Sequence, residues 1–203
     1  MSTQIKWLPS WWVVKLSKAL GQLRIIAGSW RGRKLAVLDL EGLRPTPDRV
    51  RETVFNWLQP HLGQSRCLDL FAGTGALGLE AASRGAGHVS LVELNSKAAM
   101  QLRTHCQTLS AEQCEVHLQA ATDFLNQHQQ QYDIVFIDPP YQSDYWSEVA
   151  EQLIATGSLA DYALIYLEYP RQLDKPLLPA QWQLIKEKKA GAVNYCLFRN
   201  TTE

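Results

Sequence analysis

From residue 65 onward, short apolar runs alternate with stretches in which apolar residues recur at helical spacing. The apolar runs predict buried strands, and the clearest is residues 132–137, Tyr-Asp-Ile-Val-Phe-Ile. The predicted strands cover residues 67–71, 88–93, 115–118, 132–137, 163–168, 182–186 and 192–198. The predicted helices between them cover residues 76–83, 96–109, 122–129 and 144–156. Strands that alternate with helices in this way predict an α/β fold, a parallel sheet with helices on both faces.

The first sixty residues follow a different pattern. Two β-prone runs, residues 23–27 and 34–38, flank the basic turn Gly-Ser-Trp-Arg-Gly-Arg. They predict a β-hairpin that carries arginines at its tip. Residues 43–49 then contain two prolines and a Thr/Asp start signal, followed by apolar residues at helical spacing. This pattern predicts a helix over residues 47–59 that ends near Pro60.

Composition indicates an ordinary globular protein. Of the 203 residues, 46% are apolar and 20% are charged, which excludes a disordered tail, a collagen-like fibre and a simple coiled coil. The formal net charge is zero but unevenly distributed, because residues 1–51 contain ten Lys and Arg against three Asp and Glu. The remaining residues contain ten against seventeen. The sequence therefore predicts a single domain-sized body that is acidic and carries a basic arm.

Two further features bear on location and redox state. The apolar run at residues 7–14 is interrupted by Pro9 and closed by Lys15, so it is too short to span a bilayer, and it lacks the pattern of a secretory signal. We expect a cytoplasmic protein in which residues 5–20 cap the body or, alternatively, form an amphipathic surface segment. The four cysteines show neither metal-ligand spacing nor a disulfide framework, so we expect them to be reduced, with no metal site.

Residues 73–78, Gly-Thr-Gly-Ala-Leu-Gly, form a G-x-G-x-x-G motif between a predicted strand and a predicted helix. Glycines let the backbone turn tightly and approach a ligand, and the helix that follows offers free N–H groups. Glu93 stands twenty residues after Gly73, at the end of the next strand, where a carboxylate can accept both hydroxyls of a ribose. Together these features predict a site for a nucleoside cofactor rather than a structural tight turn.

Nicotinamide dinucleotides and S-adenosylmethionine (AdoMet) both bind such a unit, and Asp69 discriminates between them. Its carboxylate precedes Gly73 by four residues, where it would stabilise the ammonium group of a methionine and repel a pyrophosphate. We therefore predict AdoMet as the cofactor. The predicted cofactor-binding residues are Asp69, Phe71, Gly73, Thr74, Gly75, Glu93 and Leu94.

The tetrapeptide Asp138, Pro139, Pro140 and Tyr141 follows the fourth predicted strand, at the sheet edge where ligands of open α/β folds react. Methylation of an exocyclic base amine requires its nitrogen lone pair to leave conjugation with the ring, which hydrogen-bond acceptors aimed at the N–H groups promote. Asp138 and the Pro139 carbonyl would be those acceptors, held rigidly by the prolines. Tyr141 would stack on an extruded base. These four residues are the predicted catalytic residues.

The motifs resemble those of a known family. Residues 69–84 and the Asp-Pro-Pro-Tyr tetrapeptide are similar to class I AdoMet-dependent methyltransferases that modify amino groups of nucleobases. Residues 24–28, 31–35 and 44–57 closely resemble the RsmD family of bacterial 16S ribosomal RNA guanine-N2 methyltransferases. The resemblance runs from about residue 21 to residue 199. It implies a Rossmann-like sheet of seven strands with an antiparallel last strand, 16S RNA of the small ribosomal subunit as substrate, and N2-methylguanine as product.

The sequence departs from the family pattern in two places. Residues 1–20 lie outside the pattern, either as a lineage-specific extension or because the start codon was assigned too far upstream. Where such enzymes often carry Asp or Asn to contact the adenine, this chain has Ala120 and Ala121. Thr122 or backbone groups would have to make that contact.

With RNA as the substrate, the cations of the basic arm would bind RNA phosphates beside the site. The shape of an RNA loop and an unstacked base would supply specificity. The predicted RNA-binding residues are Arg24, Arg31, Arg33, Lys34, Arg44, Arg49 and Arg51. The predicted organisation is an extension of unassigned role over residues 1–22, the RNA-binding hairpin and helix over residues 23–60, and the methyltransferase domain over residues 61–203. We expect a monomer that acts on an assembled or assembling small subunit.

Three other functions share some of these features. An adenine-N6 or cytosine-N4 DNA methyltransferase uses the same Asp-Pro-Pro-Tyr logic, but 203 residues leave no room for a large target-recognition domain. A dinucleotide-dependent reductase and a non-catalytic RNA-binding module would share the fold. Asp69 and the intact tetrapeptide argue against both of these alternatives.

Overall fold

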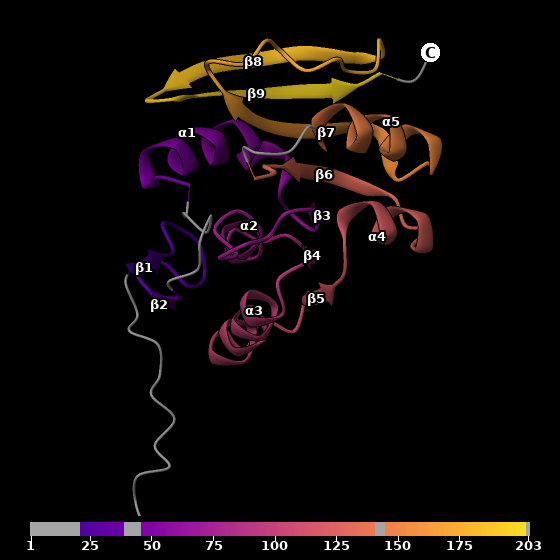
Figure 1. Ribbon diagram of the computed structural model, residues 1–203. Helices are drawn as coiled ribbons and strands as arrows, with labels where there is room; N and C mark the ends of the chain where they lie inside the picture. The colour runs from indigo at the N-terminus through magenta and orange to yellow at the C-terminus, as the bar shows by residue number, and fades with distance from the viewer. Residues whose placement is uncertain (1–20, 39–45, 141–144, 202–203) are drawn as a thin grey trace, which may run out of the picture.

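The computed structural model describes residues 21–38, 46–140 and 145–201, and its centre is a seven-stranded sheet in the order β5-β4-β3-β6-β7-β9-β8 (Figure 1). The strands are β3 (Arg66–Asp69), β4 (His88–Glu93), β5 (Cys114–Leu118), β6 (Tyr132–Ile137), β7 (Leu159–Pro170), β8 (Trp182–Ala190) and β9 (Val193–Asn200). The pairs from β5 to β7 are parallel, and β9 runs antiparallel to β7 and β8. The predicted sheet with its antiparallel last strand is confirmed.

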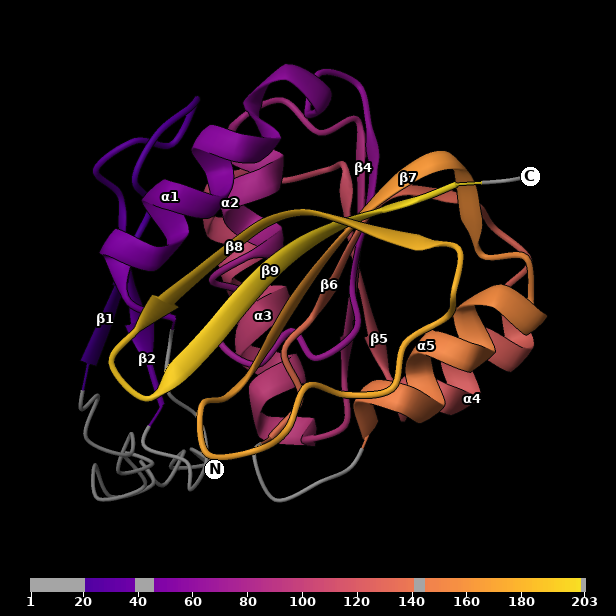
Figure 2. The ribbon, with the colours of Figure 1, turned by 90° about the horizontal axis from the view of Figure 1, so that it is seen from above.

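Helices cover both faces of this sheet (Figure 2). One face carries α1 (Asp48–Leu58), which continues as a 3₁₀ turn (Gln59–His61), together with α2 (Gly78–Ser83) and α3 (Ser96–Leu109). The other face carries α4 (Ala121–Gln127) and α5 (Tyr145–Ala155). Side chains of β6 alternate between the two cores, because successive residues of a strand point to opposite faces. The apolar run that predicted β6 is therefore buried on both sides.

The predicted hairpin is confirmed as β1 (Gly21–Arg24) paired antiparallel with β2 (Lys34–Val37). Its apolar residues Leu23, Ile25, Leu35 and Val37 are buried in the same core as α1 and α2. The hairpin is therefore packed onto the sheet domain instead of projecting from it.

Boundaries differ from the predictions at two informative places. Strand β7 begins at Leu159, four residues before the predicted start, and its pairing with β6 shifts register between Tyr132 and Ile134. This part of the strand is irregular, and Tyr162 within it has a positive φ. Polar residues interrupt the apolar pattern there, so the pattern does not indicate a strand. Helix α2 begins at Gly78, two residues later than predicted, because the preceding residues form the turns of the glycine loop.

Several predictions fall outside the described residues, namely those on the segment 5–20, Arg44 and Tyr141. In the described part of the chain, no helix has the length and apolar character needed to cross a membrane. All four cysteines lie in that part, and none forms a disulfide.

Candidate active site

The glycine loop, residues 70–77, leads from β3 to α2, and two glycines of the motif are sterically required, Gly75 in the loop and Gly78 at the start of α2. Gly75 has φ +81°, and a Cβ atom there would lie 2.7 Å from side-chain atoms of Leu79 and Leu102. At Gly78, the third glycine of the motif, a Cβ atom would lie 2.2 Å from Leu91 on β4. These two positions let the loop turn and let α2 pack directly on the strands, as a nucleotide-binding loop requires.

Glu93 ends β4 beside this loop and fixes its shape. One carboxylate oxygen accepts the N–H of Gly73 at 2.8 Å, and the other accepts the N–H of Asn95 at 2.7 Å. The side chain is half-buried, and each oxygen retains a lone pair. Glu93 therefore has the acceptors that a ribose diol needs, in a position held by the backbone. Leu94 follows it with its side chain 69% exposed.

Asp69 ends β3 and supports the loop from beneath. Its Oδ2 accepts the N–H of Gly78 at 2.9 Å, and the side chain is buried. Burial raises the pKa of Asp69 to about 7, although hydrogen bonds from the Gly78 and Phe71 amides act in the opposite direction. The contact of Asp69 with a methionine ammonium stays a prediction, whereas its observed contact is with the start of α2. Thr74 is also buried, and Phe71 is half-buried with its ring centroid 6.0 Å from that of Tyr145.

Asp138 follows β6 directly, in the centre of the sheet. As a whole residue Asp138 is half-buried, Pro139 is buried and Pro140 is exposed. Burial raises the pKa of Asp138 well above its usual value, and the neighbouring carboxylates of Glu168 and Asp69 raise it further. Three acidic groups thus meet where β3, β6 and β7 end, an environment that favours a cationic ligand and disfavours a pyrophosphate. These acidic acceptors fit AdoMet, which carries positive charge on both its sulfur and its ammonium group.

Four of the predicted RNA-binding residues, Arg31, Arg33, Lys34 and Arg49, are exposed. Arg33 lies at the hairpin tip and donates to the carbonyl of Thr108 at 3.1 Å. Arg24 is also accessible, with 56% of its side chain exposed, although it forms an ion pair with Asp48 at 3.0 Å. These five cations lie on the hairpin and the start of α1, as the sequence predicted, and their contact with RNA stays a prediction.

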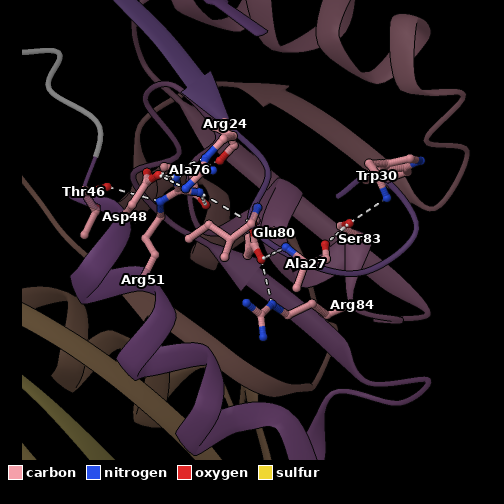
Figure 3. A network of polar contacts seen from close by, with 12 residues as sticks. Arg24, Ala27, Trp30, Thr46, Asp48, Arg51, Ala76, Glu80, Ser83 and Arg84 are labelled. Carbon is pink, nitrogen blue, oxygen red and sulfur yellow. Dashed lines mark hydrogen bonds and ion pairs between the residues drawn. The ribbon is translucent and has the colours of Figure 1, made fainter. Parts of the chain in front are cut away.

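Arg51 is the exception, because the structure contradicts its prediction as a phosphate contact. Its side chain is 1% exposed. The guanidinium binds Asp48 at 2.6 Å and the Arg24 carbonyl at 2.8 Å, and lies 3.6 Å from Glu80 (Figure 3). A group enclosed in this way has no surface to offer a phosphate. Counting charges along the sequence could not distinguish Arg51 from its exposed neighbours.

Glu80 on α2 is the acidic centre of the network that docks the hairpin (Figure 3). It is fully buried and accepts the N–H groups of Ile26 and Ala27 at 2.8 and 3.0 Å. Arg84, one turn further along α2, donates to it at 2.7 Å. Together with Arg51, these contacts join the hairpin, α1 and α2 through buried, charged hydrogen bonds.

A family model described as conserved hypothetical protein 95 matches residues 23–199. The chain belongs to this family. The ribosomal RNA small subunit methyltransferase D of Haemophilus influenzae is 50% identical over 192 residues, which cover 92% of this chain and 98% of that protein. The Escherichia coli protein of the same name is 48% identical over 183 residues, which cover 90% and 92% of the two chains. These relatives confirm the resemblance to RsmD and the class of the enzyme, a methyltransferase.

A solved structure supports the same assignment. The structure of a putative methyltransferase from Escherichia coli superposes with a TM-score of 0.85 at 45% identity, covering 90% of this chain and all of that one. This member of the conserved hypothetical protein 95 family therefore has the class I methyltransferase fold that its motifs predicted.

Sequence reasoning did not single out two polar residues near the site in this family member, Glu168 and Gln119. Glu168 on β7 is buried, and its carboxylate accepts the hydroxyl of Tyr166 at 2.8 Å. Like Asp69 and Asp138, Glu168 is an acidic residue at the carboxyl end of an apolar parallel strand. Gln119, just after β5, has a buried side-chain nitrogen without a hydrogen-bond partner among the described residues. It lies one residue before Ala120, where the sequence lacks the usual adenine contact.

Proposed function

We propose that this chain transfers the methyl group of AdoMet to the exocyclic N2 of a specific guanine in 16S ribosomal RNA of the small subunit. The observation that carries the proposal is Asp138, a half-buried acceptor at the end of β6, close to Asp69 at the end of the strand that leads into the glycine loop. The names of the relatives, ribosomal RNA small subunit methyltransferase D, support the substrate class. A substrate of this kind suits a monomeric enzyme of the cytoplasm that acts on assembled or assembling subunits.

Bound AdoMet supplies a methyl group activated by a positively charged sulfur. The chain itself provides orientation and acceptors. Asp138 and the Pro139 carbonyl accept hydrogen bonds from the guanine amine, which directs its lone pair toward the methyl group. Because the amine must lose one proton as it is methylated, Asp138 also offers an oxygen that can take that proton, and its raised pKa suits it to do so.

RNA would be held mainly by the exposed cations of the hairpin and the start of α1. Phosphate contacts of this kind position a substrate without reading its sequence, so the choice of base falls to the tetrapeptide that begins at Asp138. The unit over residues 23–60 is thus proposed as the RNA-binding arm of a methyltransferase domain over residues 61–203.

The proposal is tested by incubating the protein with labelled AdoMet and small ribosomal subunits that lack the modification. We expect label in the 16S RNA, and mass spectrometry of the digested nucleosides should identify N2-methylguanosine. Labelled N6-methyladenine or N4-methylcytosine, or transfer to DNA in preference to RNA, would contradict the proposal.

Replacement of Glu93 by alanine should weaken AdoMet binding by about 1.5–3 kcal/mol, the range for loss of a hydrogen bond to a charged group. The reason is that Glu93 supplies the ribose acceptors and also holds the Gly73 amide. Isothermal titration calorimetry measures the effect. Glu115→Ala on β5 is the matched control, because that carboxylate is exposed. Parental affinity in Glu93→Ala, or tight binding of NADH by the parent, would overturn the cofactor assignment.

Replacement of Arg31, Arg33 and Lys34 by alanine should weaken RNA binding and flatten its salt dependence. Each lost phosphate contact lowers the log–log slope by ~0.7 for a single-stranded segment, so three contacts lower it by about 2. Binding is measured by filter retention across a salt series. The control removes three exposed lysines of β8, Lys186, Lys188 and Lys189. Equal flattening by the control, or weaker binding with an unchanged slope, would show that the hairpin does not contact phosphates.

A further inference from the structure

Thr46 brings the segment before α1 into contact with the end of β6. It is buried, and its hydroxyl donates to Oδ2 of Asp138 at 3.4 Å. The two residues are 92 positions apart in the sequence. The distance is long for a hydrogen bond between oxygens, and catalytic hydrogen bonds often shorten in the complex with substrate. The RNA-binding arm thus reaches the proposed catalytic acceptor directly.

Arg51 fixes the position of Thr46. Its Nε donates to the Thr46 carbonyl at 3.2 Å, and its other nitrogens bind groups of the hairpin, α1 and the glycine loop, including the Ala76 carbonyl at 3.5 Å (Figure 3). Because this guanidinium is enclosed, moving it would leave a buried charge without partners. The backbone of Thr46 is therefore held by a group that is itself held from three directions, which keeps its side chain beside Asp138.

The contact with Thr46 gives the two oxygens of the Asp138 carboxyl group different roles. With Oδ2 bound to the Thr46 hydroxyl, Oδ1 is left to accept the N–H of the target amine. Among the described residues, the ionisable groups that interact with Asp138 are Asp69 at the end of β3 and the side chains of Tyr166 and Glu168 on β7. Burial and the two carboxylates raise the pKa of Asp138, while the hydrogen bond from Thr46 lowers it. Thr46 therefore favours the ionised form, which is the better acceptor.

We propose that Thr46 is a positioning residue for methyl transfer, whose hydroxyl orients the carboxyl group of Asp138 toward the target amine while Arg51 holds Thr46 in place. The inference rests on the proposed function in giving Asp138 its role. It adds that the arm which binds RNA also completes the catalytic site.

The test compares Thr46→Val, which removes the hydroxyl at nearly constant shape, with Thr46→Ser, which retains it. In Thr46→Val we expect kcat to fall about ten- to hundredfold, the factor for a lost hydrogen bond to a charged group, with parental affinity for AdoMet and RNA. The limb of the pH–rate profile in which kcat rises with pH should move to higher pH. Thr46→Ser should keep the parental profile and a kcat within about threefold of the parent.

Thr53→Val is the matched control, because the Thr53 hydroxyl donates only to the Arg49 carbonyl one turn earlier in α1. It should leave kcat and the pH profile unchanged. Equal losses in Thr46→Val and Thr46→Ser would assign the effect to packing and overturn the proposal, as would a parental kcat and pH profile in Thr46→Val. Asp138→Ala distinguishes failure of this inference from failure of the proposed function. If it is inactive while Thr46→Val is normal, only this inference fails, and if it is fully active, the proposed function fails.

Discussion

Replacement of Asp138 by alanine is expected to abolish methyl transfer and leave AdoMet binding nearly intact. The alanine removes the acceptor for the target amine, and a positioned proton acceptor contributes roughly 10²–10⁴ in rate. The cofactor loses little, because the contacts of the glycine loop and Glu93 lie on β3 and β4. Single-turnover rates with labelled AdoMet and calorimetry of AdoMet binding separate the two effects. A parental rate in Asp138→Ala would refute the mechanism.

Asp138→Asn sharpens this prediction, because asparagine keeps one acceptor oxygen and cannot titrate. The pKa of Asp138 is raised by burial and by Glu168 and Asp69, so the parent should lose activity as pH falls through that raised value. Asp138→Asn should retain part of the rate and lack this limb. Asp133→Asn, at the opposite end of the same strand, is the control and should keep the parental profile. An unchanged limb in Asp138→Asn would assign the titration to another group.

Elements with one continuous pattern could be predicted from the sequence almost to the residue. The strand β6 and the helix α3 (Ser96–Leu109) match their predicted ranges. The spacing of their apolar residues fits only one type of secondary structure in each case. Strand β7 could not be bounded, since its first residues are held by pairing with β6 and not by their own pattern. Long-range pairing that overrides local preference is invisible in a local window.

The site residues, too, include some that the sequence pattern identifies and some that it does not. Glu93 and Asp138 were identified because acidic residues at the carboxyl ends of buried strands face ligands in this fold. Glu80 and Thr46 were not identified, and Arg51 was assigned to RNA instead of to this network, because each of the three has a partner 25 or more residues away in the sequence. One signal was available. A lone acidic residue within the apolar stretch Leu-Glu-Ala-Ala must be paired if that helix is buried, and Glu80 is.

Glu80→Ala should have the largest effect on stability, lowering the free energy of unfolding by about 3–5 kcal/mol, the cost of breaking a buried ion pair by removing one partner. The change leaves Arg51 and Arg84 without their shared carboxylate and leaves the Ile26 and Ala27 amides without an acceptor. Urea unfolding followed by circular dichroism measures the loss. Glu151→Ala on the exposed face of α5 is the control and should stay within about 0.5 kcal/mol of the parent.

Glu80→Gln tests whether charge or shape supplies this stability. Glutamine keeps one oxygen for an amide N–H but cannot neutralise two buried guanidinium groups, so the loss should fall between those of the parent and Glu80→Ala. Because Glu80 holds the hairpin, trypsin should also cleave at Arg31 or Arg33 faster in both variants than in Glu151→Ala. A loss below about 1 kcal/mol in Glu80→Ala, smaller than the cost of one unsatisfied buried group, would mean that apolar packing alone docks the hairpin. In that case Leu23→Ala and Leu35→Ala, which remove buried side chains of β1 and β2, should accelerate the same cleavage where Glu80→Ala does not.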